Sequence, residues 1–196
     1  GEIFLTSKTI LVFGWSGQDG SLISKSLLEK KYKVIGFSRR DVFDLNNEVS
    51  KTIVKDIQVE KGDINDFKLI SKLIEKYKPE EIYNLAAQSS VGKSFLDPIN
   101  TIEGITSGTL NILEIARKLH YDGRIFFAGS SEIYGETIKG ADINHKHKPI
   151  SPYAIAKQAS FNLVRLYREL YKINCVTGVL FNHESPLRNK NFVTHK

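Results

Sequence analysis

Short, mostly apolar runs alternate with longer amphipathic segments along this chain. Such runs are typical of buried parallel strands, and we predict strands at residues 9–13, 33–37, 57–63, 81–85, 124–128 and 175–180. Between the runs, apolar positions recur at helical spacing, as at Ile70, Ile74 and Tyr77. This alternation predicts an α/β fold: a doubly wound parallel sheet with helices on both faces and ligands at the carboxyl ends of the strands.

Two stretches interrupt this pattern. Residues 41–56 are polar and poorly periodic. Residues 135–150 are irregular and hold His145 and His147 between lysines, without partners of metal-ligand type. We therefore assign these histidines to the surface or to a substrate loop and predict no metal site. We also predict a long helix over residues 98–120.

Composition changes the picture mainly by exclusion. The 196 residues, 41% hydrophobic and 26% charged, favour one globular domain. We expect a cytoplasmic protein without a membrane partner, because no apolar run approaches the roughly 18 residues of a membrane span and no signal-peptide core is present. The single cysteine, Cys175, lies in an apolar run and excludes an intrachain disulfide. The net charge of +6 is spread over scattered lysines, which favours an anionic small molecule over nucleic acid.

A glycine motif follows the first predicted strand and precedes an amphipathic segment. Gly14, Gly17 and Gly20 form the pattern Gly-x-x-Gly-x-x-Gly. Glycines in this position permit a tight turn, a close backbone approach to a pyrophosphate and a close helix–sheet contact, while the helix amino terminus supplies N–H donors. The context predicts a dinucleotide site; a plain turn between strand and helix is the alternative.

The end of the second predicted strand indicates which dinucleotide is bound. NAD enzymes usually place a carboxylate here, whereas this chain has Arg39 and Arg40. A guanidinium can hold the 2′-phosphate of NADP in a fork, so we predict NADP. Asp41 argues slightly against this choice. The alternative is a solvated charged loop, or arginines that serve a subunit contact.

Other strand ends carry further candidate groups. Asp63 is placed to cap the adenine, and the small residues at 86–87 would let the backbone lie close to a cofactor ribose. Gln88 and Ser89 follow as hydrogen-bonding groups, although the same small residues also suit close packing against the glycine loop. Ser130 and Glu132 lie at the end of the fifth strand.

A tyrosine and a lysine stand four positions apart at a predicted helix start, which places Tyr153 and Lys157 on one helical face. A phenol has a pKa of about 10, but a neighbouring ammonium favours the phenolate and lowers this pKa. Tyr153 is therefore a candidate proton acceptor. The alternative is an ordinary amphipathic helix.

The order of these motifs resembles that of an extended short-chain dehydrogenase/reductase. Within that superfamily, residues 17–20, 81–89, 131–135 and 181–186 are most similar to the GDP-mannose 4,6-dehydratases. The resemblance runs from about residue 9 to the end, whereas family members extend well beyond this length. It implies a Rossmann domain over residues 1–196, truncated before most of the substrate domain, with 181–196 as the start of the substrate-binding region.

The resemblance implies specific site residues. The implied NADP contacts are Gly14, Trp15, Ser16, Gly17, Gln18, Asp19, Gly20, Arg39, Arg40, Asp63, Ile64, Leu85, Ala86, Ala87, Gln88, Ser89, Tyr153, Lys157, His183 and Arg188. The implied catalytic residues are Ser130, Glu132, Tyr153 and Lys157, and the implied substrate contacts are Ser89, Ser130, Glu132, Tyr153 and Asn182. The chain departs from the family at Trp15, usually a smaller residue, at Asn100, often a tyrosine, at Ser130, commonly threonine, and at residues 146–150 before the tyrosine helix.

The implied activity converts GDP-mannose into GDP-4-keto-6-deoxymannose with bound NADP as a transient hydride carrier. Tyr153 would take the proton of the 4-hydroxyl while Lys157 holds the phenolate, and Glu132 would remove the proton from C5 as water leaves C6 with help from Ser130. The implied partners are the sugar nucleotide and further copies of the chain, as a dimer or tetramer. Alternatives are a related NADP-dependent dehydratase, reductase or epimerase, for example on a GDP-heptose, or a truncated, non-catalytic NADP-binding module.

Overall fold

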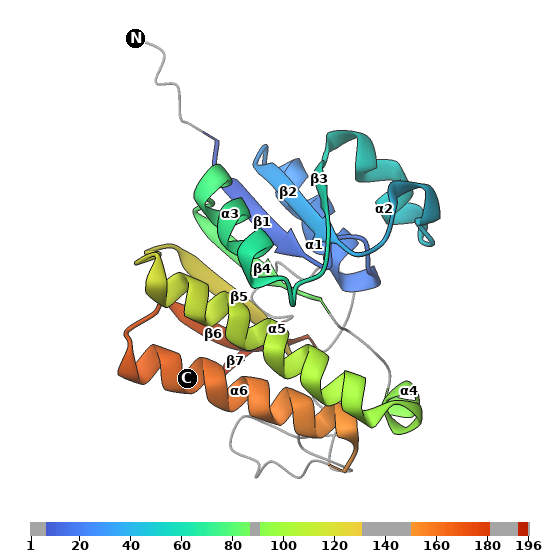
Figure 1. Cartoon of the computed structure of the whole chain (residues 1–196). Helices are drawn as coiled ribbons and strands as arrows, with labels where there is room; N and C mark the ends of the chain where they lie inside the picture. The colour runs from blue at the N-terminus through green and yellow to red at the C-terminus, as the bar shows by residue number, and fades with distance from the viewer. Residues whose placement is uncertain (1–6, 87–90, 131–149, 181–191, 196) are drawn as a thin grey trace.

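A seven-stranded sheet forms the centre of the molecule in the computed structural model, which describes residues 7–86, 91–130, 150–180 and 192–195 (Figure 1). The strand order is β3-β2-β1-β4-β5-β6-β7. The strands are β1 Thr9–Phe13, β2 Lys33–Ser38, β3 Gln58–Lys61, β4 Glu81–Asn84, β5 Arg124–Gly129, β6 Cys175–Leu180 and β7 Phe192–His195. The α-helices are α1 Gln18–Glu29, α2 Glu48–Ile53, α3 Phe67–Tyr77, α4 Val91–Leu96, α5 Pro98–Lys118 and α6 Pro152–Leu170, and Val42–Asp44 (η1) and Val54–Asp56 (η2) are 3-10 turns.

The predicted parallel sheet is confirmed for β1 to β6, which pair in parallel throughout. The strand predicted at residues 57–63 is shorter, and β7, which was not predicted, pairs with β6 in the antiparallel direction. The polar, poorly periodic residues 41–56 contain α2 and both 3-10 turns. With six residues, α2 is too short to show an apolar period. It begins instead at a side-chain cap, since Asn47 accepts the backbone N–H of Ser50 at 2.8 Å.

The two faces of the sheet bury separate hydrophobic clusters, because successive strand residues point to opposite sides. In β1, Leu11 and Phe13 pack with residues of α3, α5 and α6 on one face. Ile10 and Val12 pack with residues of α1 and with Trp15 on the other. The helices therefore cover both faces, as predicted. Among the helices that the structure describes, none combines the length and apolar character that a membrane span would require.

The helices α5 and α6 run side by side over the β5–β6 half of the sheet (Figure 1). A buried hydrogen bond from Thr109 Oγ1 to Ser160 Oγ, 3.0 Å long, joins them. Nearer their carboxyl ends, the Tyr167 hydroxyl donates to Glu114, which also binds Arg117 through two bonds of 2.8 Å. Arg117 and Tyr167 together lower the pKa of Glu114 to about 2. These contacts hold the middle and the carboxyl-terminal half of α6 against α5.

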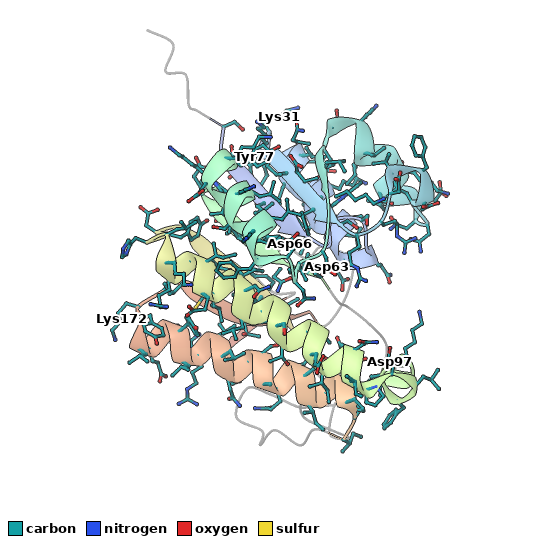
Figure 2. All side chains as sticks on the ribbon, in the orientation of Figure 1. Lys31, Asp63, Asp66, Tyr77, Asp97 and Lys172 are labelled. Carbon is teal, nitrogen blue, oxygen red and sulfur yellow. The ribbon has the colours of Figure 1, made fainter. Side chains whose placement is uncertain are left out.

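Side-chain caps define where α3, α5 and α6 begin. Asp66 accepts the backbone N–H of Leu69 at the start of α3, and Asp97 accepts that of Asn100 at the start of α5 (Figure 2). Ser151 caps α6 by accepting the N–H of Ala154 at 3.0 Å. This cap lies two residues before the tyrosine of the Tyr-x-x-x-Lys pair and fixes the start of α6 there.

Candidate functional site

The loop after β1 packs tightly against the turn after β4. Gly14 has φ +76°, and a Cβ at this position would lie 2.6 Å from the backbone of Leu85. A Cβ on Gly20 would lie 1.9 Å from the carbonyl oxygen of Gly14. The packing of the protein itself therefore requires glycine at both positions.

Gly17 differs from the other two glycines of the motif. A Cβ there would meet only the carbonyl oxygen of Gly14, at an ordinary contact distance of 3.6 Å. Gly17 is the N-cap of α1, where it provides no side-chain acceptor for the N–H groups of the first turn. Internal packing therefore does not explain the glycine at position 17. The close approach of an anion to the helix amino terminus would explain it, because a side chain there would occupy the space of the anion.

A cleft of about 480 Å³ opens from this glycine loop at the carboxyl ends of the parallel strands. The end of β2, the turn after β3, the turn after β4 and the first turns of α5 complete its walls. The lining residues are Gly14, Ser16, Gly17, Phe37, Ser38, Arg39, Arg40, Gly62, Ile64, Asn65, Leu85, Ala86, Asn100, Thr101, Gly104 and Ile105. The cleft is thus at the edge of the sheet where open α/β proteins bind their ligands.

Both predicted arginines line the cleft and are exposed. Arg40 is anchored, because its Nη1 donates to the carbonyl oxygen of Asp44 at 2.9 Å. Among the described residues, Arg39 has no recorded hydrogen-bond or ion-pair partner. Asp41 does not line the cleft; its carboxylate accepts the N–H of Phe43 and binds Lys61, and these contacts lower its pKa. The nearby carboxylate is therefore already engaged within its own turn.

Tyr153 and Lys157 lie on one side of α6, as their spacing predicts. The ring of Tyr153, 5% exposed, packs against Ile105 of α5. Lys157 is 7% exposed and donates to the carbonyl oxygen of Ala128 at 3.1 Å, and its Nζ lies 5.8 Å from the centre of the Tyr153 ring. Burial lowers the pKa of Lys157 to about 8. At pH 7 this lysine is still mostly protonated and brings a positive charge near the phenol.

Because Lys157 is buried, the free energy of unfolding should depend on pH. The pKa of this lysine is about 8 in the fold and 10.5 for an ordinary lysine, so between these values the unfolded chain binds more protons and stability rises with pH. Below pH 8 the full penalty is present. Lys157→Met should raise the free energy of unfolding at pH 7 by about 2 kcal/mol, because the pKa shift corresponds to roughly 3 kcal/mol and the lost hydrogen bond offsets about 1.

Urea unfolding at pH 7 and pH 9.5 measures this effect. Compared with the wild-type protein, Lys157→Met should lose most of the gain in stability between the two pH values. Lys72→Met, which changes an exposed lysine of α3, should leave that gain unchanged. Two results would contradict the prediction: a Lys157→Met protein whose stability rises with pH as much as that of the wild type, or one that is less stable at pH 7. Either would show that burial of the Lys157 ammonium does not destabilise the fold.

The structure places the other predicted site residues unevenly. Trp15 is 1% exposed and lies in the core, where a Cβ on Gly36 would come within 2.6 Å of its indole ring, so only its backbone is available to a ligand. Gln18, Asp19 and Asp63 do not line the cleft. The Asp63 carboxylate accepts two hydrogen bonds from Asn65 within its own turn.

Ser130 directly follows β5 and is half-buried. Seven predicted residues lie outside the described part of the chain: Ala87, Gln88, Ser89, Glu132, Asn182, His183 and Arg188.

Several cleft residues were not predicted. Asn65 follows β3, and Thr101, Gly104 and Ile105 lie in the first turns of α5. Asn100 drew attention only as a departure from the family. The sequence shows where α5 begins, but no local signal indicates that its first turns face the glycine loop. In the described residues, no group of three histidine, cysteine or acidic side chains is arranged to hold a metal ion.

Comparison with known proteins identifies the family. A family model described as GDP-mannose 4,6 dehydratase matches residues 11–196. GDP-mannose 4,6 dehydratase 1 of Arabidopsis thaliana is 37% identical over 209 residues, covering 100% of this chain and 57% of the relative. GDP-mannose 4,6 dehydratase of Drosophila melanogaster is 40% identical over 200 residues, covering 96% of this chain and 50% of the relative. The chain therefore spans about half the length of the curated relatives it matches.

A solved structure agrees with the fold. The dTDP-glucose 4,6-dehydratase of Streptomyces venezuelae, determined with NAD and TYD bound, has a TM-score of 0.77 at 25% identity. This match covers 88% of the present chain and 55% of that one. The family inferred from the motifs is confirmed by the family model and by relatives that match along the whole chain. The chain belongs to the GDP-mannose 4,6-dehydratase family.

Proposed function

We propose that this chain binds NADP in the cleft and forms the cofactor-binding part of an enzyme that converts GDP-mannose into GDP-4-keto-6-deoxymannose. The observation that carries the proposal is the unhindered Gly17 at the amino terminus of α1, which lines the same cleft as Arg39 and Arg40. Helix amino termini and guanidinium groups both favour phosphate oxygens, which a dinucleotide with an extra phosphate presents at two places.

The cleft residues fit this cofactor in kind. Gly17 and the first turn of α1 would hold the pyrophosphate, and Arg39 and Arg40 the 2′-phosphate. Ile64 and Asn65 offer an apolar and a polar contact to the adenine, while Leu85 and Ala86 lie beside the glycine loop. Relatives in this family carry dehydratase names, and a structural neighbour was solved with NAD, which supports a nicotinamide cofactor here.

The residues of α6 supply the proton chemistry. NADP, when bound, accepts a hydride from the sugar and later returns it. Tyr153 takes the proton of the 4-hydroxyl, and the mostly protonated Lys157 stabilises the resulting phenolate. Ser130 would donate a hydrogen bond to the reacting oxygens. Glu132, outside the described residues, remains the predicted base for the proton at C5.

The test is incubation of a catalytically competent form of the protein, as long as its relatives, with NADP and GDP-mannose, followed by NMR of the product sugar. A 4-keto-6-deoxy sugar at the end of the reaction is the expected result. A hexose epimerised or reduced without loss of water would instead indicate an epimerase or reductase. Unchanged GDP-mannose in the presence of bound NADP would leave the chain as a cofactor-binding module and would contradict the dehydratase proposal.

A further inference from the structure

Two serine hydroxyls meet between the glycine loop and the arginines. The Oγ atoms of Ser16 and Ser38 lie 2.9 Å apart. Ser38 Oγ also accepts the backbone N–H of Arg40 at 3.0 Å. Ser16 is 3% exposed, whereas Ser38 is half-buried at the wall of the cleft.

Counting protons assigns the direction of the bond between these hydroxyls. Each hydroxyl has one proton and two acceptor positions. Within the described residues, Ser38 is the sole recorded partner of the Ser16 hydroxyl, so the buried proton of Ser16 is satisfied only if Ser16 donates. Ser38 then accepts twice, from Ser16 and from the N–H of Arg40, and its own proton is left to donate.

Ser16 is itself held in place. The side-chain amide of Asn47 donates to the carbonyl oxygen of Ser16 at 2.7 Å. The amide oxygen of Asn47 accepts the hydroxyl of Ser21 at 3.2 Å and caps α2 through Ser50. The hydroxyl pair is therefore anchored to both α1 and α2.

A hydroxyl whose two acceptor positions are filled can only donate a further hydrogen bond. It therefore suits a phosphate better than a ribose diol. A phosphate dianion needs donors, and Ser38 adds one beside the guanidinium groups of Arg39 and Arg40. A bare ribose hydroxyl needs an acceptor, which NAD enzymes supply as a carboxylate. Among the described residues that line the cleft there is no carboxylate, and Asp41 is bound to Lys61.

We propose that Ser38 is a third ligand of the 2′-phosphate of NADP and a determinant of cofactor choice, with Ser16 fixing it as a donor. This inference rests on the proposed binding of NADP. It adds a neutral donor to the site predicted from the two arginines alone.

Calorimetric titration of the wild-type protein and of Ser38→Ala with NADP and with NAD tests the proposal. The wild type should bind NADP at least tenfold more tightly than NAD. Ser38→Ala should weaken NADP about tenfold, as expected for loss of a hydrogen bond to a charged group, and should change NAD affinity less than twofold. Ser38→Thr keeps the hydroxyl and should hold NADP affinity within threefold. Ser107→Ala, at an exposed position of α5, is the matched control and should change neither affinity.

The outcomes separate the two proposals. If the wild type prefers NADP but Ser38→Ala keeps the same ratio of affinities, the role of Ser38 is wrong while NADP binding stands. If Ser38→Ala weakens NADP and NAD equally, Ser38 only supports the glycine loop, and the inference also fails. A wild-type protein without preference would overturn the choice of NADP itself.

Discussion

Tyr153→Phe should lower turnover of GDP-mannose about 1,000-fold in a catalytically competent form of the protein. The phenol is the group proposed to take the 4-hydroxyl proton, and positioned acid–base groups contribute 100- to 10,000-fold in rate. Phenylalanine keeps the ring that packs against Ile105 and Ala156, so the fold should persist. NADP affinity should change little, because the glycine loop and the arginines are untouched.

Absorbance of reduced nicotinamide and the rate of product formation measure this loss. Tyr171→Phe, which removes a hydroxyl just beyond the carboxyl end of α6, is the control and should keep the wild-type rate. Glu132→Gln should differ from Tyr153→Phe: oxidation at C4 continues, the C5 proton stays, and reduced cofactor accumulates. Product formation at the wild-type rate in Tyr153→Phe would exclude this phenol as the proton acceptor.

Gly20→Ala should destabilise the fold far more than Gly17→Ala, although the substitution is the same. At Gly20 the new methyl would lie 1.9 Å from the carbonyl oxygen of Gly14, and the backbone must move. We expect a loss of about 3 kcal/mol in the free energy of unfolding. At Gly17 the methyl meets no atom closer than 3.6 Å, so the loss should stay below about 1 kcal/mol.

The effects on cofactor binding should have the reverse order. Measured per folded molecule, NADP affinity should fall more in Gly17→Ala than in Gly20→Ala. In Gly17→Ala the methyl would occupy the space in which the pyrophosphate approaches α1, and NADP affinity should fall by a factor of about 100 or more. Thermal unfolding and calorimetric titration of the same samples separate the two effects. A Gly17→Ala protein that keeps wild-type affinity would show that the pyrophosphate does not approach this residue.

Much of the fold was determined by local patterns in the sequence. The apolar run at residues 9–13 predicts a strand buried on both sides, and Leu11 and Val12 do enter different clusters. The stripe at Ile70 and Ile74 predicts α3, and the spacing of Tyr153 and Lys157 places both on one face of α6. These features depend on residues within about one or two helical turns, which the chain order displays directly.

The roles within the cleft were decided by tertiary structure. The motif shows three equivalent glycines, yet Gly14 and Gly20 are required by contacts inside the protein while Gly17 is not. Trp15, in the same motif, is buried under Gly36 of the neighbouring strand. Asp41 argued against NADP in the sequence, but its carboxylate binds Lys61 and does not line the cleft.

These differences share one physical cause. The cleft exists because β1 lies between β2 and β4 in the sheet, which brings the glycine loop, the arginines and the start of α5 together from segments far apart in the chain. Ser16, 22 residues away, fills one of the acceptor positions of Ser38 and so leaves the Ser38 hydroxyl as a donor. Local patterns in the sequence predict most of the strands and long helices. Which side chains remain available to bind depends on partners across the sheet, and chain order does not display those partners.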